Sequence, residues 1–273
     1  MVGQKVLLFI LFCVYMFKGT VGIYLESPIS GEQVCVGTGS GFSKMGDSSY
    51  HYKRLYKQYV DCTYVFGNLE ITHLKRGQDT SFLANIRVVT GYMLLFANEV
   101  DVPLPSLVFV RGDMRFMGYT VLIAMFNNVP MPALKEISGD LKYYNPSCFL
   151  DTIRWDLIVR GKVIKAKSSF AHRNCDDCSP ECEDRDGQSH CWGPGPDMCQ
   201  TVPLIECDYV CHNATCHEEG MLGCCHPQCV GGCTDGWINS ACDYCRNFKY
   251  QGRCIQDCPE TSYYIGEDCI DLD

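Results

Sequence analysis

Cysteine is the residue type with the greatest chemical potential in this sequence, since 21 of the 273 residues are cysteines and 17 of them fall between residues 175 and 269. A cysteine can act as a thiolate nucleophile, bind a metal or form a disulfide. Two pairs have the spacing of zinc ligands and four histidines lie near them: Cys175 with Cys178, Cys242 with Cys245, and His190, His212, His217 and His226. Zinc binding is therefore one interpretation of this region, and disulfide bonding is the other.

The N-terminus favours disulfides. Lys5 precedes an apolar run over residues 6–17, and small residues follow as far as Gly22. The run is shorter than the roughly 18 apolar residues of a membrane helix, so residues 1–22 are predicted to be a secretory signal peptide, with a membrane anchor as the alternative. Its removal takes away Cys13 and leaves 20 cysteines, an even number, as complete pairing in an oxidising compartment requires. We expect a secreted, extracellular protein with no membrane span, free thiolate, metal or cofactor.

Other catalytic motifs are missing from the sequence. The segment 37–41 is similar to a phosphate-binding loop, but Phe42 stands where a dinucleotide fingerprint needs glycine. Neither Gly-x-Ser-x-Gly nor His-Glu-x-x-His occurs. The net charge of −9 becomes −11 when Lys5 and Lys18 leave with the signal, which argues against nucleic acid and anionic membranes as partners. We expect no enzyme, and we expect Asn213, in Asn-Ala-Thr, to be a glycosylation acceptor.

Between residues 23 and 174 the chain alternates short apolar runs with glycine turns. Gly67, Gly91, Gly118 and Gly139 each begin such a run and lie 24, 27 and 21 residues apart. A repeat of this length predicts a β-solenoid, in which each turn adds a strand to parallel sheets, and an ordinary β-sandwich is the alternative. Helices are expected over residues 49–60 and 150–159, where apolar side chains recur at helical spacing.

Several motifs carry a resemblance to a known family. They are Gly67-Asn68-Leu69-Glu70-Ile71-Thr72, Ser81-Phe82-Leu83, Gly91-Tyr92, Val110-Arg111-Gly112-Asp113-Met114, Leu134-Lys135-Glu136-Ile137, Ile153-Arg154-Trp155 and Cys191-Trp192-Gly193. Their order and spacing resemble the ectodomain of the epidermal growth factor receptor family. The resemblance implies a receptor L domain over residues 23–174, which is a right-handed, leucine-rich-repeat-like β-helix. It also implies a furin-like, disulfide-rich rod over residues 175–273.

The resemblance also implies how the cysteines pair, which spacing alone leaves open. The implied pairs are Cys35–Cys62, Cys148–Cys175, Cys178–Cys191, Cys182–Cys199, Cys207–Cys216, Cys211–Cys224, Cys225–Cys233, Cys229–Cys242, Cys245–Cys254 and Cys258–Cys269. By the same resemblance Trp192 packs on the end of the solenoid and fixes the angle between the two domains.

In that family the first domain binds a growth factor through a backbone edge covered by apolar side chains. The matching edge here is residues 42–46, where Phe42 replaces leucine, Lys44 replaces glutamine and Gly46 is retained. The other implied contacts depart from the family. His73 replaces tyrosine, Ala97 and Ala124 replace leucine, and Met117 replaces a glutamate. The resemblance therefore implies a divergent or weakly bound growth factor of the epidermal type.

Three functions are consistent with the sequence. The first is a secreted decoy that sequesters such growth factors. The second is a truncated ectodomain that docks on full-length receptors, and the third is a structural matrix module. Residues 254–259 run straight into the next cysteine module, and ten residues separate Cys258 from Cys269, so we expect no dimerisation arm. A second ligand-binding domain, a membrane span and a kinase are likewise not expected.

Overall fold

Two sheets of mainly parallel strands form the solenoid in the computed structural model, which describes residues 24–38, 47–125, 127–144, 148–166, 175–201, 205–211 and 215–272. The first sheet has the order β1-β2-β3-β5-β7-β9: Tyr24–Glu26, Gln33–Val36, Tyr64–Phe66, Val88–Val89, Phe109–Val110 and Glu136–Ile137. The second has the order β11-β10-β8-β6-β4: Val163–Ala166, Leu141–Tyr144, Val121–Ala124, Met93–Phe96 and Leu69–Thr72. Only the β1–β2 pair within these sheets is antiparallel.

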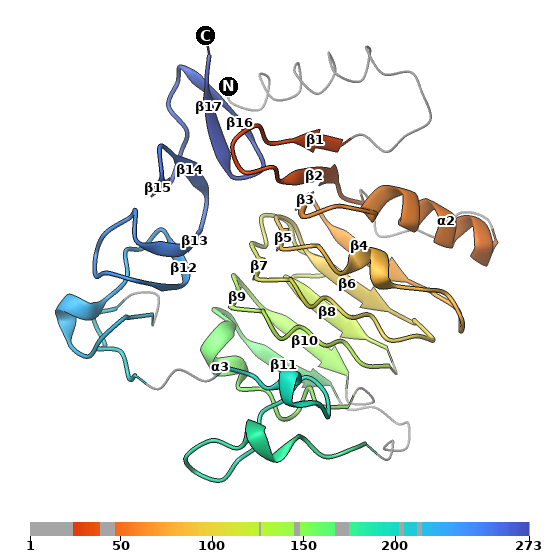
Figure 1. The fold of residues 1–273 in the computed structure, drawn as a ribbon. Helices are drawn as coiled ribbons and strands as arrows, with labels where there is room; N and C mark the ends of the chain where they lie inside the picture. The colour runs from red at the N-terminus through yellow and green to blue at the C-terminus, as the bar shows by residue number, and fades with distance from the viewer. Residues whose placement is uncertain are drawn as a thin grey trace.

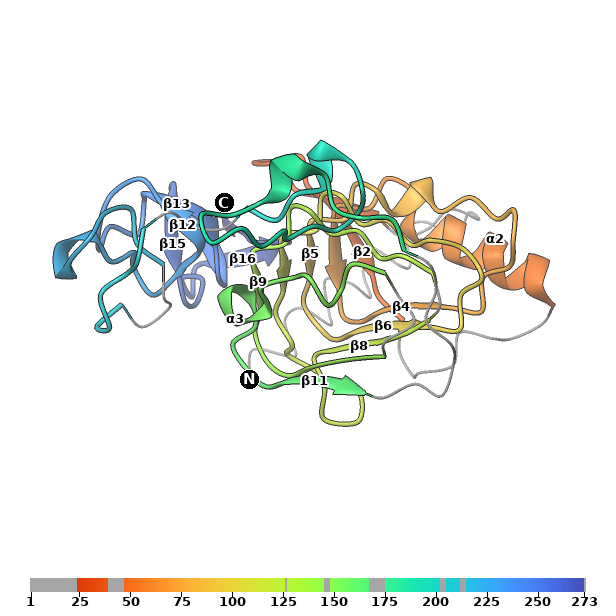
Figure 2. The same ribbon diagram turned by 90° about the horizontal axis from the view of Figure 1, so that it is seen from below.

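From β3 to β10 successive strands alternate between the two sheets, so that each turn of the chain adds one strand to each (Figures 1 and 2). This confirms the solenoid, and the β-sandwich alternative is wrong.

The glycine repeat has a steric origin. A Cβ on Gly91 would lie 2.1 Å from Oδ1 of Asn68. That oxygen accepts the backbone N–H of Tyr92, while Nδ2 of Asn68 donates to the carbonyl of Thr38. Glycine at this corner lets neighbouring turns approach closely enough to share these bonds.

The solenoid core lies between the two sheets and is covered at both ends. At the N-terminal end, the helix α2 (Ser48–Tyr59) buries Leu55 and Tyr59 completely. Asp47 caps this helix by accepting the N–H of Tyr50, so the predicted helix is confirmed to within one residue. At the other end Trp192 joins the core with 2% of its surface exposed and meets Trp155 edge to face, with ring centroids 5.5 Å apart.

The predicted helix over residues 150–159 is wrong in length, because only α3 (Trp155–Ile158) is helical. Phe149 has a left-handed φ of 70°, and Arg154 has a ψ of 76°, so neither residue can continue a right-handed helix. The turns between them allow the indole N–H of Trp155 to donate a hydrogen bond to the carbonyl of Leu150. The apolar side chains expected to be core are nonetheless buried there.

The cysteine-rich region consists of short elements joined by disulfides. Its strands are β12 (Cys229–Cys233), β13 (Cys242–Cys245), β14 (Phe248–Tyr250), β15 (Arg253–Ile255), β16 (Ser262–Ile265) and β17 (Asp268–Asp271). Short 3-10 turns occur at Ser81–Leu83 in the solenoid and, in this region, at Pro180–Cys182, Pro196–Met198 and Met221–Gly223. β12 pairs with β13, and the last four strands form a small sheet in the order β15-β14-β17-β16.

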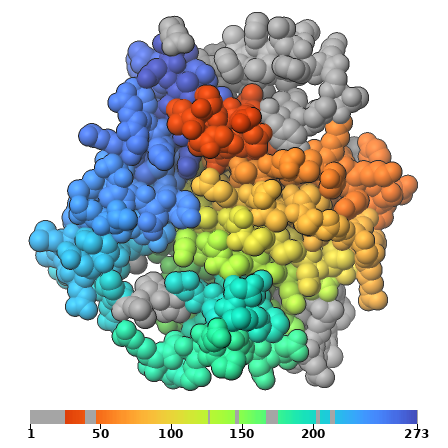
Figure 3. All heavy atoms as spheres, viewed as in Figure 1, coloured from red at the N-terminus to blue at the C-terminus, as the bar shows by residue number. Residues whose placement is uncertain are grey.

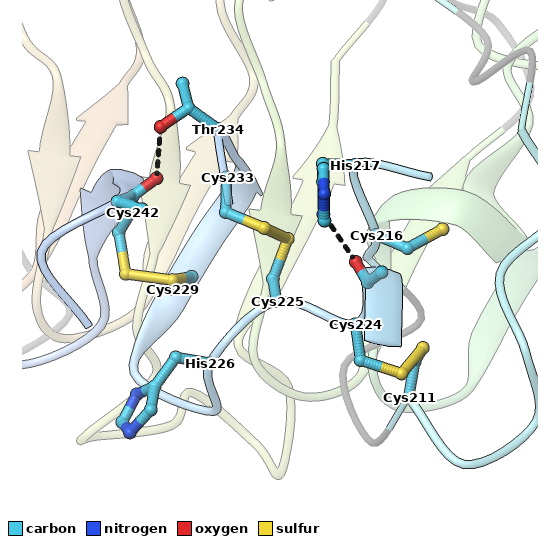
Figure 4. The surroundings of a disulfide bond; sticks show 12 residues. Cys211, Cys216, His217, Cys224, Cys225, His226, Cys229, Cys233, Thr234 and Cys242 are labelled. Atoms are coloured by element: carbon cyan, nitrogen blue, oxygen red, sulfur yellow. Dashed lines mark hydrogen bonds between the residues drawn. A yellow bond between two sulfur atoms is a disulfide. The ribbon is translucent and has the colours of Figure 1, made fainter. Parts of the chain in front are cut away.

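Ten disulfides join the twenty cysteines outside residues 1–22, in the same ten pairs that the family resemblance implies. Both pairs with zinc-like spacing are in disulfides with other cysteines, so the zinc interpretation loses its thiolate ligands. His226 points away from the sulfur atoms of the neighbouring Cys225–Cys233 and Cys229–Cys242 bridges (Figure 4). No group of three metal-ligating residues with suitable geometry occurs among the described residues.

The cysteine-rich region folds back along the outer face of the six-stranded sheet (Figures 1 and 3). A cross-strand row of that sheet faces outward and is buried by apolar residues of the cysteine-rich region. The row is Val34, Tyr64, Val88 and Phe109, and the covering residues are Val230, Tyr244 and Ile265. Glu136 ends the row and is paired with Arg246. One face of the solenoid is therefore occupied by the protein itself.

Candidate functional site

The outer face of the five-stranded sheet is the candidate site. Its strands alternate between core and outside, because Leu69, Met93, Val121 and Leu141 are core residues and their successors in the strands point the other way. The strand register arranges the outward residues in two rows across the sheet. The first row is Glu70, Leu94, Leu122, Lys142 and Ile164, and the second is Thr72, Phe96, Ala124, Tyr144 and Ala166.

The two rows differ in exposure. Leu94 and Leu122, in the first row, are 4% and 8% exposed because Tyr92, Phe116 and Tyr119 pack with them. In the second row, by contrast, Phe96 is 42% exposed, and Ala124 and Tyr144 beside it are partly exposed. The C-terminal half of these strands thus presents an open apolar surface, which we call the ligand shelf and define as Phe96, Ala97, Ala124, Tyr144 and His73.

Three of the predicted contact residues lie together on this shelf. His73 follows β4, and its N–H donates to the carbonyl of Phe96 at 3.0 Å. Ala97 follows β6, and its N–H donates to the carbonyl of Ala124 at 2.9 Å. The His73 ring meets that of Phe96 with centroids 5.5 Å apart. His73 and Ala97 both have left-handed backbone angles, with φ of 56° and 53°, so the chain turns sharply out of each strand there.

Met117 does not lie with the other three. It occupies the tip of a two-residue hairpin turn between Phe116 and Tyr119, just before β8, at the opposite end of the strands. Both tip residues have positive φ, 51° at Met117 and 87° at Gly118, as a type I′ turn requires. Met117 is 79% exposed, and any partner that touches both it and the shelf must extend along the whole length of the strands.

The remaining predicted contacts, Phe42, Lys44 and Gly46, and the glycosylation acceptor Asn213 lie outside the described residues. Two described residues, Thr38 and His51, contact the two ends of β4. Thr38 pairs with Asn68 just before that strand, and the His51 ring hydrogen-bonds to the carbonyl of Thr72 at its end. β4 is the edge strand of the five-stranded sheet and is next to the shelf.

The first row carries the charges of this face. Glu70 is buried and accepts a hydrogen bond from the Tyr92 hydroxyl. The ammonium of Lys142 lies 5.3 Å from the ring centre of Tyr119 and 5.4 Å from that of Tyr144, within the range of cation–π attraction. The face therefore offers apolar area, aromatic rings and one cation. It can bind a protein surface that has apolar side chains and a carboxylate.

The sequence analysis did not identify four residues of this face: Phe96, Lys142, Tyr144 and Ile164. A usable signal was present for the first three, because each lies an odd number of residues from a core position in a strand of the glycine repeat. Ile164 lies in β11, where no residue belongs to the core. What was missing was a reason to choose this sheet over the other one.

Two family models match the chain. The furin-like cysteine rich region matches residues 165–273, and the receptor L domain matches residues 61–159. The fold and these matches together define the class of protein, which is a receptor L domain followed by a furin-like cysteine-rich region. Both are ectodomain modules without catalytic function, and no helix within the described residues is long and apolar enough to cross a bilayer.

The similar curated proteins include epidermal growth factor receptors and a receptor tyrosine-protein kinase. The chain is 32% identical over 249 residues to the epidermal growth factor receptor of Drosophila melanogaster, 33% over 261 to that of Gallus gallus, and 33% over 267 to the receptor tyrosine-protein kinase erbB-2 of Rattus norvegicus. These matches cover 85%, 89% and 88% of this chain but 17%, 36% and 21% of the relatives. The chain is a homologue of the ectodomains of the epidermal growth factor receptor family.

Proposed function

We propose that this protein is secreted, that it binds growth factors of the epidermal type on the ligand shelf, and that it acts as a decoy that antagonises receptor signalling. The observation that carries the proposal is the difference between the two solenoid faces. The cysteine-rich region covers the outer row of the six-stranded sheet, whereas the described residues leave Phe96 and its neighbours on the five-stranded sheet open. An exposed apolar surface of this kind is typical of a protein-binding site.

The mode of binding that we propose is strand addition beside β4, with apolar side chains closing over the contact. Phe42, Lys44 and Gly46 would supply the backbone edge, while the shelf would supply the apolar cover. Ala97 and Ala124 are smaller than the leucines implied by the family resemblance, which removes on the order of 2 kcal/mol of apolar contact at about 25 cal/mol per Å². We therefore expect a partner with larger apolar side chains opposite these two positions.

Titration calorimetry against a panel of epidermal-type growth factors tests the proposal, with the intact protein and two variants. Phe96→Asp places a charge at the centre of the shelf and is expected to lower the affinity by about 30-fold, or roughly 2 kcal/mol. Leu222→Asp is the matched control, because Leu222 is 80% exposed on the cysteine-rich region and away from the sheet. Equal affinities of the two variants, or no binding by the intact protein, would contradict the proposal.

Cell assays separate the decoy from the other two hypotheses. A decoy lowers receptor phosphorylation in proportion to the growth factor it binds, and Phe96→Asp abolishes that effect. A truncated ectodomain that docks on receptors would instead cross-link to them in medium without growth factor. A matrix module would show neither effect. We also propose residues 1–22 as the signal peptide, with the boundary between the two mature domains at residues 174 and 175.

A further inference from the structure

The two ends of the described chain meet in one contact. The hairpin formed by β16 and β17, at the end of the cysteine-rich region, lies against the hairpin formed by β1 and β2, at the start of the solenoid (Figures 1 and 3). The hydroxyls of Ser27 and Ser30 both donate to Oδ2 of Asp268, at 2.5 Å each. Asp268 is 1% exposed, so these bonds are made out of contact with water.

A second carboxyl, that of Glu32, is buried by the same contact. Its side chain is 1% exposed, and Oε1 lies 3.2 Å from Nη1 of Arg87. Oε2 is buried without a regular hydrogen bond among the described residues, although the backbone N–H of Glu267 faces the Glu32 carboxyl and favours its ionised form. Gly266, at the turn of the terminal hairpin, is so close that an added Cβ would lie 2.4 Å from Oε2. Removing the hairpin would therefore expose this oxygen to water, so the burial of Glu32 depends on docking of the hairpin.

Several charged groups face Glu32 from the elements packed around it. Burial, followed by the negative charge of Glu267, raises the pKa of Glu32 to about 7, with a smaller contribution from Asp268, while the charge of Arg87 and the backbone N–H of Glu267 oppose this shift. Burial also raises the pKa of Glu267, against the charges of Arg87, Lys249 and Arg111. The Tyr64 hydroxyl also faces Glu32. Two carboxyls with raised pKa values thus meet across one interface.

We propose that the β16–β17 hairpin is a pH-sensitive latch, which docks on the β1–β2 hairpin when Glu32 is protonated and loosens when Glu32 ionises. The direction of this pH dependence follows from the linkage between proton binding and docking. A carboxyl whose pKa is higher in the docked state than its ordinary value of 4.5 takes up a proton on docking. Docking is therefore strongest below pH 4.5 and weakens as the pH rises to about 7. The latch goes beyond ligand binding and does not depend on any growth factor.

The Glu136–Arg246 contact in the same interface contributes to docking with the opposite pH dependence and serves as an internal control. Burial alone would raise the pKa of Glu136, but hydrogen bonds and charge from Arg246, with help from Ser138 and Arg160, hold it below its ordinary value. Its contribution to docking is present at neutral pH and is lost as the pH falls. Acid should therefore tighten the end of the interface at Glu32 while loosening the end at Glu136.

Hydrogen exchange of the intact protein tests the latch without any ligand. Protection factors, from which the intrinsic pH dependence of exchange has been removed, are compared at pH 5.5 and pH 8 for the amides of β16 and β17. The linkage predicts that their protection falls by about 30-fold between these pH values. Glu32→Gln keeps the shape of the side chain without its charge, so its protection should fall much less between these pH values, and only the part of the pH dependence that Glu267 contributes should remain. Glu26→Gln, an exposed change on the same hairpin, should behave as the original protein.

Protection that does not change with pH in the original protein would overturn the latch, and so would a Glu32→Gln variant that keeps the original pH dependence. If that variant fails to fold, a titration of the 13C-labelled carboxyls of the original protein decides the matter. A Glu32 carboxyl that titrates well above 4.5 supports the latch, and one that titrates at its ordinary value refutes it.

Discussion

Arg246 offers the sharpest test of how the cysteine-rich region is held to the solenoid. Its guanidinium lies 2.5 Å and 3.0 Å from the two oxygens of Glu136, whose side chain is 1% exposed. Glu136 also accepts a hydrogen bond from Ser138 at 2.7 Å and one from Arg160 at 3.2 Å. Arg246 lies between β13 and β14, and Arg246→Met removes its positive charge while keeping most of the apolar volume of the side chain.

The expected cost follows from leaving a buried charge with fewer partners. Breaking a buried ion pair by removing one partner costs about 3–5 kcal/mol. Because Arg160 and Ser138 still bind Glu136, we expect the lower end, about 3 kcal/mol, which is a change of roughly 150-fold in the docking equilibrium. Arg154→Met is the matched control, since Arg154 and Asp156 form an exposed pair at 2.7 Å and such pairs contribute less than about 1 kcal/mol.

Hydrogen exchange at β12 and β13 gives the opening free energy of the docked region, with the disulfides intact. The amides of β12 and β13 should exchange faster in Arg246→Met by the stated factor, while those of β6 and β8 in the solenoid should not change. Adding Glu136→Gln to Arg246→Met should recover much of the loss, because the buried charge is then removed. If Arg246→Met and Arg154→Met differed by less than 1 kcal/mol at β12 and β13, the ion pair would not hold the two regions together.

Two further predictions concern the core and acid. Trp192→Ala should destabilise the solenoid by about 3–5 kcal/mol in urea denaturation, because it opens a cavity against Trp155. Trp237→Ala is the control and should cost much less, because the Trp237 side chain is 43% exposed. Equal costs would mean that Trp192 does not support the core. The depressed pKa of Glu136 contributes stability that is present above its ordinary value of 4.5 and is lost as the pH falls through the lower value of the folded protein. Protection factors at β12 and β13, corrected for the intrinsic pH dependence of exchange, should therefore fall in acid in the original protein but not in Glu136→Gln.

Local features of the sequence predicted the solenoid well. Gly91 must be glycine because its neighbour Asn68 leaves no room for a Cβ. The position of this turn can therefore be read from the glycine in the sequence. The helix at Ser48–Tyr59 was predictable from apolar spacing. The helix over residues 150–159 was not, because Arg154 within it has a non-helical ψ of 76° that apolar spacing does not reveal. The predicted contact residues lie at two ends of the strands, with Met117 apart from His73, Ala97 and Ala124, and the exposed Phe96 was not among them.

What the sequence determined by itself was the repeat, the even number of cysteines outside residues 1–22 and the alternation of core and outward residues along the strands. Tertiary structure alone decided which outward row is open. The row that contains Val34, Tyr64 and Phe109 is as apolar as the row that contains Phe96, and both alternate with core residues in the same way. They differ because Val230, Tyr244 and Ile265, far along the chain, pack on the first row and not on the second. Burial of an outward residue depends on such distant contacts, which spacing within a strand does not encode.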